Sequence, residues 1–183
     1  LYHSNATFRN HFDRCAAAFA SLLERPLADV LEARDSVELH SQPPLLQASI
    51  FSLDFALGRA LMDWGLKPVT VCGHSLGEYV AATIAGVLSL EDAARLVQAR
   101  ALGTARCARG GMLSLATGED AALGLVADVP GLALAACNSE RDAVVSGPPE
   151  AIDEAERQAR RMNIATRRLA VSNGFHSPLM APA

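Results

Sequence analysis

Cysteines are few in this chain, and no two of them are close together. The four are spread along the sequence and include no C-x-x-C pair, so the pattern predicts neither a disulfide framework nor a zinc site. We expect all four to be small apolar core residues of a protein kept in a reducing compartment, which favours a cytoplasmic location.

The chain also lacks an excess of positive charge. Its 16 Lys and Arg residues are outnumbered by 20 Asp and Glu, for a formal net charge of −4, which gives nucleic-acid binding no electrostatic support. No apolar run approaches the length of a membrane span, and no signal peptide, repeat or disordered linker is visible. With 183 residues, 50% of them hydrophobic, the sequence predicts a protein that buries a core, with neither nucleic acid nor membrane as partner.

The clearest chemical pattern surrounds Ser75. Residues 73–77 read Gly-His-Ser-Leu-Gly, after an apolar run over 68–72 and before an alanine-rich segment over 78–86. The order strand, G-x-S-x-G, helix is that of a nucleophile elbow, in which a sharp turn holds the serine at the start of a helix. The two glycines keep side chains out of this turn, and the helix N-terminus favours an oxyanion beside the serine. We therefore predict that Ser75 is a catalytic nucleophile.

The first part of the chain is expected to be mostly helical. Apolar residues at helical spacing predict a first helix: Phe8, Phe12, Cys15, Phe19 and Leu22. A long helix should begin at an N-cap, Ser41, and end at Gly65. Its expected apolar stripe is Leu46, Ile50, Leu53, Leu57 and Leu61. A further helix should follow Ser89, because Asp92 lies three residues on, as in a capping box.

Near residue 110 the sequence changes from mostly helical patterns to a mixture of strand and helix patterns. Strand and helix patterns then follow in the order strand, helix, strand, strand, helix, strand, which is the ferredoxin-like order. The expected elements are strands at 112–116, 132–137, 143–146 and 164–171, with helices at 119–126 and from Pro148 onward. We therefore predict an α/β fold: an α/β-hydrolase-like large subdomain from residues 1–110 with 172–183, and an inserted ferredoxin-like small subdomain over 111–171.

A serine hydroxyl needs a base to take its proton. His176 is the best candidate, because it lies in a loop just after the last expected strand, where catalytic residues gather. We expect His3, His11 and His40 to be structural or solvent-facing, with His11 at the surface beside the core position Phe12, and His74 to be a packing and turn residue.

Taken together, these segments resemble the acyltransferase domain of modular polyketide and fatty-acid synthases, the malonyl-CoA:acyl-carrier-protein transacylase family. Residues 73–79 (Gly-His-Ser-Leu-Gly-Glu-Tyr) match the family's serine motif, and residues 174–180 (Gly-Phe-His-Ser-Pro-Leu-Met) match its histidine motif. Residues 96–100 match the helix that carries its substrate arginine, and 136–139 and 144–147 resemble its small-lobe strands. The resemblance runs through the whole chain.

The resemblance implies a ping-pong acyl transfer. His176 would take the proton of Ser75, which attacks the malonyl thioester while the backbone N–H of Leu76 and a second donor hold the oxyanion. No bound cofactor and no metal are implied. Malonyl-CoA is the acyl-CoA substrate, and phosphopantetheine on a partner acyl carrier protein accepts the acyl group. A ketosynthase and other synthase domains in the same polypeptide are the further partners expected.

The resemblance also implies residues that choose the substrate. Arg100 would grip the free malonyl carboxylate, although spacing alone favours a solvated helix arginine. Phe175 resembles the malonyl-selecting pattern, since it would crowd a 2-methyl group. Asn173 stands where malonyl-type domains often have histidine, and Gln42 either faces the site or belongs to the capping region of the long helix.

The chain departs from the family pattern at both ends. It begins at Leu1, after the Gly-Gln-Gly strand that supplies the family's second oxyanion donor, and it stops soon after the histidine motif. We interpret both ends as cut, and expect such a piece to have reduced activity or stability. Two alternatives stay open: a serine thioesterase or hydrolase of the α/β-hydrolase type, and a non-catalytic truncated scaffold domain.

Overall fold

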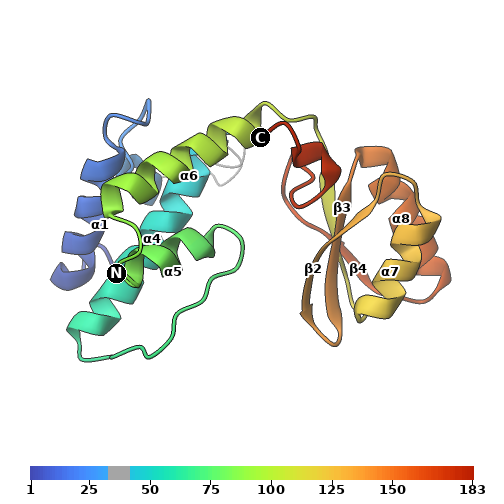
Figure 1. Cartoon of the computed structure of the whole chain (residues 1–183), viewed down its shortest axis with the longest axis horizontal. Helices are drawn as coiled ribbons and strands as arrows, with labels where there is room; N and C mark the ends of the chain where they lie inside the picture. Colours follow the sequence, from blue (N-terminus) through green and yellow to red (C-terminus); the bar gives the residue numbers. More distant parts are fainter. Residues whose placement is uncertain (33–41) are drawn as a thin grey trace. The chain divides into compact units, whose positions relative to one another are not determined.

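A computed structural model of the chain describes residues 1–32 and 42–183. The chain divides into two compact units, Leu1–Leu102 and Gly103–Ala183 (Figure 1), and each has a hydrophobic core of its own. The first unit is helical and the second combines helices with a sheet. The division into subdomains at residues 110 and 172 remains a prediction.

Helices build the first unit. Within residues 1–32 and 42–102 they are α1 (Ala6–Phe19), α2 (Asp29–Glu32), α4 (Pro43–Asp63), α5 (Gly77–Ile84) and most of α6 (Leu90–Ala105). The expected first helix is confirmed: α1 buries Phe8, Phe12, Cys15 and Phe19. The predicted surface position of His11 is wrong, because its side chain is buried and its Nε2 lies 2.7 Å from Asp63 Oδ2 on α4. A histidine beside a core phenylalanine is buried here because the neighbouring helix supplies a polar partner.

The long helix α4 ends as predicted. Gly65 has a φ of +103°, a left-handed conformation that suits glycine. Its N–H donates to the Met62 carbonyl and the Leu66 N–H donates to the Leu61 carbonyl, which is the Schellman arrangement of a helix C-terminus. At the other end Gln42 is the N-cap, and the predicted cap, Ser41, lies outside the described residues.

The apolar stripe predicted for α4 is not the face that packs. Four of its leucines and isoleucines are exposed, with exposed fractions of 38–41%: Ile50, Leu53, Leu57 and Leu61. The buried face instead carries Phe51, which meets Phe19 of α1 edge to face at 5.9 Å between ring centroids. Because α4 is apolar on most of its circumference, periodicity alone could not decide which face meets α1.

α4 also has the length and composition of a membrane span. An 18-residue window within Pro43–Asp63 has a mean hydropathy of 1.3, and half of that window is buried inside the described chain. The expectation that no segment reaches this length is therefore wrong, although a core helix of a globular protein meets the same criterion.

The predicted strand over 68–72 is not formed. Val69 is fully exposed, and within the described residues the backbone of 67–72 makes no hydrogen bond to another backbone group. A strand is defined by its ladder to a neighbour, so an extended apolar segment without a partner remains irregular. The helix after it, α5, begins at Gly77, close to where it was expected.

The second unit has the predicted order of elements. They are β1 (Gly111–Leu115), α7 (Glu119–Asp128), β2 (Ala133–Ser139), β3 (Asp142–Gly147), α8 (Pro149–Arg161), β4 (Thr166–Arg168) and a short 3₁₀ helix, η1 (Pro178–Met180). The strands form one antiparallel sheet in the order β2-β3-β1-β4. Leu113 of β1 pairs with Val145 of β3, and both are fully buried under the helices.

The expectation that all four cysteines are core residues holds for only two of them. Cys15 and Cys107 are buried, whereas Cys72 and Cys137 are exposed. Burial raises the pKa of the Cys15 thiol to about 12, so this thiol stays protonated and behaves as an apolar core residue.

Candidate active site

Ser75 has the backbone conformation expected of a serine held in a sharp turn. Its φ of +53° lies in the left-handed region, which non-glycine residues seldom adopt and which is frequent at functional sites. Around it the Gly77 N–H donates to the His74 carbonyl at 2.9 Å, and the Glu78 N–H donates to the Ser75 carbonyl at 3.1 Å. The turn therefore presents the serine at the head of α5.

The turn closes tightly at Gly73. A Cβ at this position would lie 2.0 Å from the carbonyl carbon of Gly77, so only glycine fits here. The Gly73 N–H also donates to Oε1 of Glu78 at 3.3 Å. The steric reason predicted for Gly77 is wrong, since a Cβ there would meet nothing within 4 Å in the described chain.

Leu76, the predicted oxyanion donor, is the N-cap of α5 and is buried. Within the described part of the chain its backbone N–H has no acceptor. The first N–H groups of a helix have no partner inside the helix and carry the positive end of its dipole. The N–H beside Ser75 can therefore donate to a developing negative charge.

Arg100 of α6 contacts the serine directly. Its Nη2 donates to the Ser75 Oγ at 3.1 Å, and its Nη1 donates to the Oε1 of Gln47 on α4. The structure thus brings together Ser75 and Arg100, which lie 25 residues apart in the sequence. Arg100 differs in this from Arg95 on the same helix, which is exposed and pairs with Asp92.

The environment of Arg100 favours an anion. Burial lowers the pKa of its guanidinium, and the neighbouring Tyr79 acts in the opposite direction. Gln47 and Ser75 accept from the guanidinium as neutral groups. A carboxylate is the group that a guanidinium binds most strongly, because its two oxygens can accept from two N–H groups at once.

Gln47 is a residue of this site that no sequence pattern predicted. It lies on α4, one turn after the N-terminal prolines, and only 5% of its surface is exposed. A buried glutamine in a largely apolar helix needs a hydrogen-bond partner, and this was the available signal. It pointed to a polar contact but not to Arg100, because the partner is 53 residues away.

His176 lies in the second unit, in a loop with its own internal support. Its φ is +61° and its side chain is exposed. The next residue, Ser177, donates its hydroxyl to the Gly174 carbonyl at 2.6 Å and accepts from the Leu179 N–H, capping η1. Because Ser75 belongs to the first unit, the pairing of Ser75 with His176 remains a prediction.

Asn173 anchors this loop. It is buried, and its Nδ2 donates to the Thr104 carbonyl at 3.0 Å, while its Oδ1 accepts from the Ser172 hydroxyl at 3.2 Å. Phe175 is half-buried. Both residues share the loop with His176, and their contact with substrate remains a prediction.

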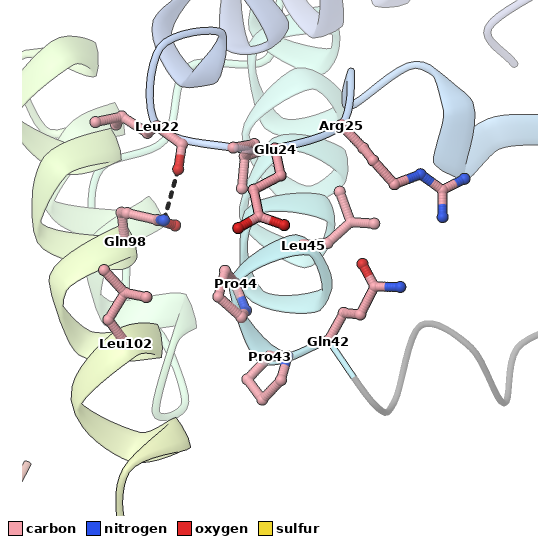
Figure 2. A pocket seen from close by; sticks show the side chains of 10 residues that line it. Leu22, Glu24, Arg25, Gln42, Pro43, Pro44, Leu45, Gln98 and Leu102 are labelled. Atoms are coloured by element: carbon pink, nitrogen blue, oxygen red, sulfur yellow. Dashed lines mark hydrogen bonds between the residues drawn. The ribbon is translucent and has the colours of Figure 1, made fainter.

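Gln42 lies beside a cavity in the first unit. The cavity is bounded by the loop over 22–25, the start of α4 and one face of α6, and Ser75 and Arg100 do not line it (Figure 2). The role of Gln42 at the substrate site remains a prediction. Among the described residues no group of three or more His, Cys, Asp or Glu side chains could hold a metal ion.

The whole chain, residues 1–183, matches the family model described as "Acyl transferase domain". Among curated proteins it is 40% identical to the phenolphthiocerol synthesis polyketide synthase type I Pks15/1 of Mycobacterium marinum, over 100% of this chain and 9% of that protein. It is 39% identical to polyketide synthase GfsB of Streptomyces halstedii, over 96% of this chain and 3% of that protein. The chain belongs to the acyl transferase domain family and is an acyltransferase domain similar to those of polyketide synthases.

Solved structures agree with this assignment. The acyltransferase domain from module 8 of the salinomycin polyketide synthase superposes with a TM-score of 0.90 at 33% identity, covering 97% of this chain and 43% of that one. The acyl-carrier-protein S-malonyltransferase of Burkholderia pseudomallei superposes with a TM-score of 0.86 at 26% identity, covering 99% of this chain and 60% of that one. The chain thus spans less than two thirds of the proteins named here and has their mixed α/β fold.

Proposed function

We propose that this domain transfers a malonyl-type acyl group from CoA to the phosphopantetheine thiol of an acyl carrier protein, by way of an acyl-serine. The observation that carries the proposal is the hydrogen bond from the Arg100 guanidinium to the Ser75 Oγ. A cation so close to the nucleophile favours an acyl group whose own negative charge lies close to its reacting carbonyl. Malonyl thioesters have this property, because a single carbon separates their carboxylate from the thioester.

In the first half-reaction His176 takes the proton of the Ser75 hydroxyl, and the Ser75 oxygen attacks the thioester carbonyl. The negative charge that develops on the carbonyl oxygen is stabilised by the Leu76 N–H at the start of α5. The C–S bond then breaks, CoA leaves as its thiol with the proton returned by His176, and the acyl group remains on Ser75 as an ester.

In the second half-reaction the same groups act in reverse order. His176 takes the proton of the carrier's pantetheine thiol, the sulfur attacks the acyl-serine, and Ser75 leaves with the proton. Arg100, held by Gln47, keeps the acyl carboxylate in place through both steps. For the acyl group to pass to the carrier thiol and not to water, water must be kept away from the acyl-serine ester.

The finer description of the fold is part of the proposal. The left-handed φ of Ser75 and the helix that starts two residues later support a nucleophile elbow. The strand order β2-β3-β1-β4, with helices after β1 and β3, supports a ferredoxin-like small subdomain over 111–171. Residues 1–110 with 172–183 would then form the large subdomain.

The proposed partners follow from the relatives. Those named above are polyketide synthases of which this chain spans a small share, which supports a ketosynthase, an acyl carrier protein and other synthase domains in one polypeptide. The exposed thiols of Cys72 and Cys137 support a reducing, cytoplasmic location.

Intact-protein mass spectrometry after incubation with malonyl-CoA tests the proposal. We expect one malonyl adduct per protein, located on Ser75 and absent from Ser75→Ala. Lack of an adduct on a full-length synthase would favour a scaffold role. Rapid loss of the adduct to water, without transfer to a carrier protein, would favour a thioesterase.

A second measurement isolates the role of Arg100. In Arg100→Ala we expect malonyl loading to fall by a factor of about 100 or more, because a charge-assisted bidentate contact is lost, while loading from acetyl-CoA is kept or increased. Arg95→Ala, an exposed arginine of the same helix, is the matched control and should load like the wild type. Equal loss of malonyl and acetyl loading in Arg100→Ala would contradict this role.

A further inference from the structure

The first unit contains a cavity of about 270 Å³ that the acyl-transfer chemistry does not use. It lies between the loop over 22–25, the start of α4 and the face of α6 that carries Gln98 and Leu102 (Figure 2). Apolar groups form part of its wall: Leu22, Leu23, Pro43, Pro44, Leu45 and Leu102. Its volume suits one long side chain or a small organic molecule, and is below that of a drug-sized pocket.

Gln98 leaves an unsatisfied acceptor at this cavity. Its Nε2 donates to the Leu22 carbonyl at 2.6 Å, which fixes the orientation of the amide, because the reverse orientation would place two oxygens together. The Oε1 is buried and has no hydrogen-bond partner within the described residues. A buried acceptor without a partner costs free energy, so a ligand that donates a hydrogen bond here would be favoured.

Glu24 adds a negative charge to the same space. Its carboxylate projects between Gln98 and Leu45 in Figure 2, whereas the guanidinium of Arg25 points away from it. Among the described residues Glu24 makes no hydrogen bond and no ion pair. The carboxylate and the Gln98 Oε1 thus offer acceptors only, on a partly apolar wall.

The start of α4 does not turn this site into an anion site. A helix N-terminus normally attracts anions through its free N–H groups, but the first two residues of α4 are Pro43 and Pro44, which have no N–H. The start of α4 therefore offers fewer N–H donors to an anion, whereas the Glu24 carboxylate and the Gln98 Oε1 are still present as acceptors.

We propose that this cavity binds a primary alkylammonium group on a short apolar stem. The three N–H donors of an ammonium match the two oxygens of the Glu24 carboxylate and the Gln98 Oε1. The methylene stem would lie on Leu45 and the neighbouring apolar wall, as lysine stems do on protein surfaces. A lysine side chain of another polypeptide segment and a free diamine share this chemistry.

NMR titration of the ¹⁵N-labelled protein tests the site with two probes, Nα-acetyl-lysine N-methylamide and 1,5-diaminopentane. We expect at least one probe to shift the amide signals of residues 22–25 and 98–102, with a dissociation constant on the order of 1 mM. Tighter binding of the lysine derivative would identify a polypeptide as the source, and tighter binding of the diamine a free amine. Nα-acetyl-norleucine N-methylamide, which has the stem without the charge, should bind at least about tenfold more weakly.

Three variants make the test specific. Glu24→Gln should weaken binding about five- to tenfold, and Glu24→Lys, which places an ammonium at the same rim, should abolish it. Glu91→Gln, an equal change of charge at an exposed position of α6, should bind like the wild type, and thermal unfolding shows that each variant is folded. The proposal is overturned if neither probe shifts these signals at about 50 mM, if the norleucine analogue binds as tightly, or if Glu24→Gln binds like the wild type.

Discussion

At the scale of single residues, the two glycines of the serine turn have different roles. Gly73→Ala places a Cβ against the backbone of Gly77 at 2.0 Å, and because backbone cannot move aside cheaply, we expect a loss of stability of about 3 kcal/mol or more and loss of acyl-serine formation. Gly77→Ala meets open space and should change stability by less than about 1 kcal/mol. Thermal unfolding of the two variants makes the comparison, and similar melting temperatures would contradict it.

Gln47 should act through Arg100 and not on the reacting atoms. Gln47→Ala removes the acceptor that orients the guanidinium, so we expect KM for malonyl-CoA to rise about tenfold with a smaller change in kcat. Gln47→Glu should raise KM further, because its carboxylate competes with the substrate for Arg100. Steady-state kinetics of malonyl transfer measure both constants.

Ser49→Ala is the matched control for Gln47. Ser49 is also a buried polar residue of α4, but its hydroxyl donates to the Leu45 carbonyl of its own helix. Its kinetic constants should equal those of the wild type. A fall in kcat without a rise in KM for Gln47→Ala would show that the residue has another role.

The identity of the site residues was more predictable than their contacts. The serine turn could be predicted because glycines and a following helix are local signals. The contact between Arg100 and Gln47 could not, because a helix pattern does not say which polar residue of another helix lies opposite. His11 was mispredicted for the same reason: its partner, Asp63, is 52 residues away.

At the scale of elements, an ion-pair network joins β4 to α8. Arg168 of β4 contacts Asp153 at 2.6 Å and Glu156 at 2.7 Å, and Arg160 contacts Glu156 at 2.9 Å. The hydrogen bond from Arg168 is the main reason that the pKa of Glu156 lies below its ordinary value of 4.5. Two of these groups are about half exposed, so the stabilisation is modest.

The network gives the second unit a predictable dependence on pH. A carboxyl group whose pKa is lower in the folded state contributes stability above its unfolded pKa and loses it as the pH falls through the folded value. We therefore expect Arg168→Gln to be less stable than the wild type at pH 7, and this difference to shrink as the pH falls below 4.5. Melting temperatures of both proteins between pH 7 and about pH 3 measure it, and a difference that does not depend on pH would contradict the network's role.

Helix ends were predicted better than helix faces. Gly65 ends α4, and Ser89 and Asp92 cap α6 with hydrogen bonds of 2.7 and 3.0 Å, because caps depend on residues adjacent in the chain. The packed face of α4 and the strand over 68–72 depend on what lies beside them. Leu53 of the expected stripe is exposed and Val69 is unpaired within the described chain for this reason.

At the scale of the whole chain, each unit has its own core, so core substitutions should act locally. Phe51→Ala in the first unit should cost about 3–5 kcal/mol, and Leu113→Ala in the second about 2–5 kcal/mol, because both side chains are fully buried. Hydrogen exchange should show lost protection within Leu1–Leu102 for the first variant and within Gly103–Ala183 for the second. Equal loss of protection in both units for either variant would show that the chain unfolds as one cooperative unit.

The distribution of cysteines provides a natural pair of attachment points. Cys72 and Cys137 are exposed, one in each unit, whereas Cys15 and Cys107 are buried. A thiol-reactive nitroxide should therefore react with the two exposed positions and leave the buried pair untouched. Pulsed electron resonance between the two labels would then report the separation of the serine-bearing and histidine-bearing halves directly, in the unsubstituted protein and in the presence or absence of malonyl-CoA.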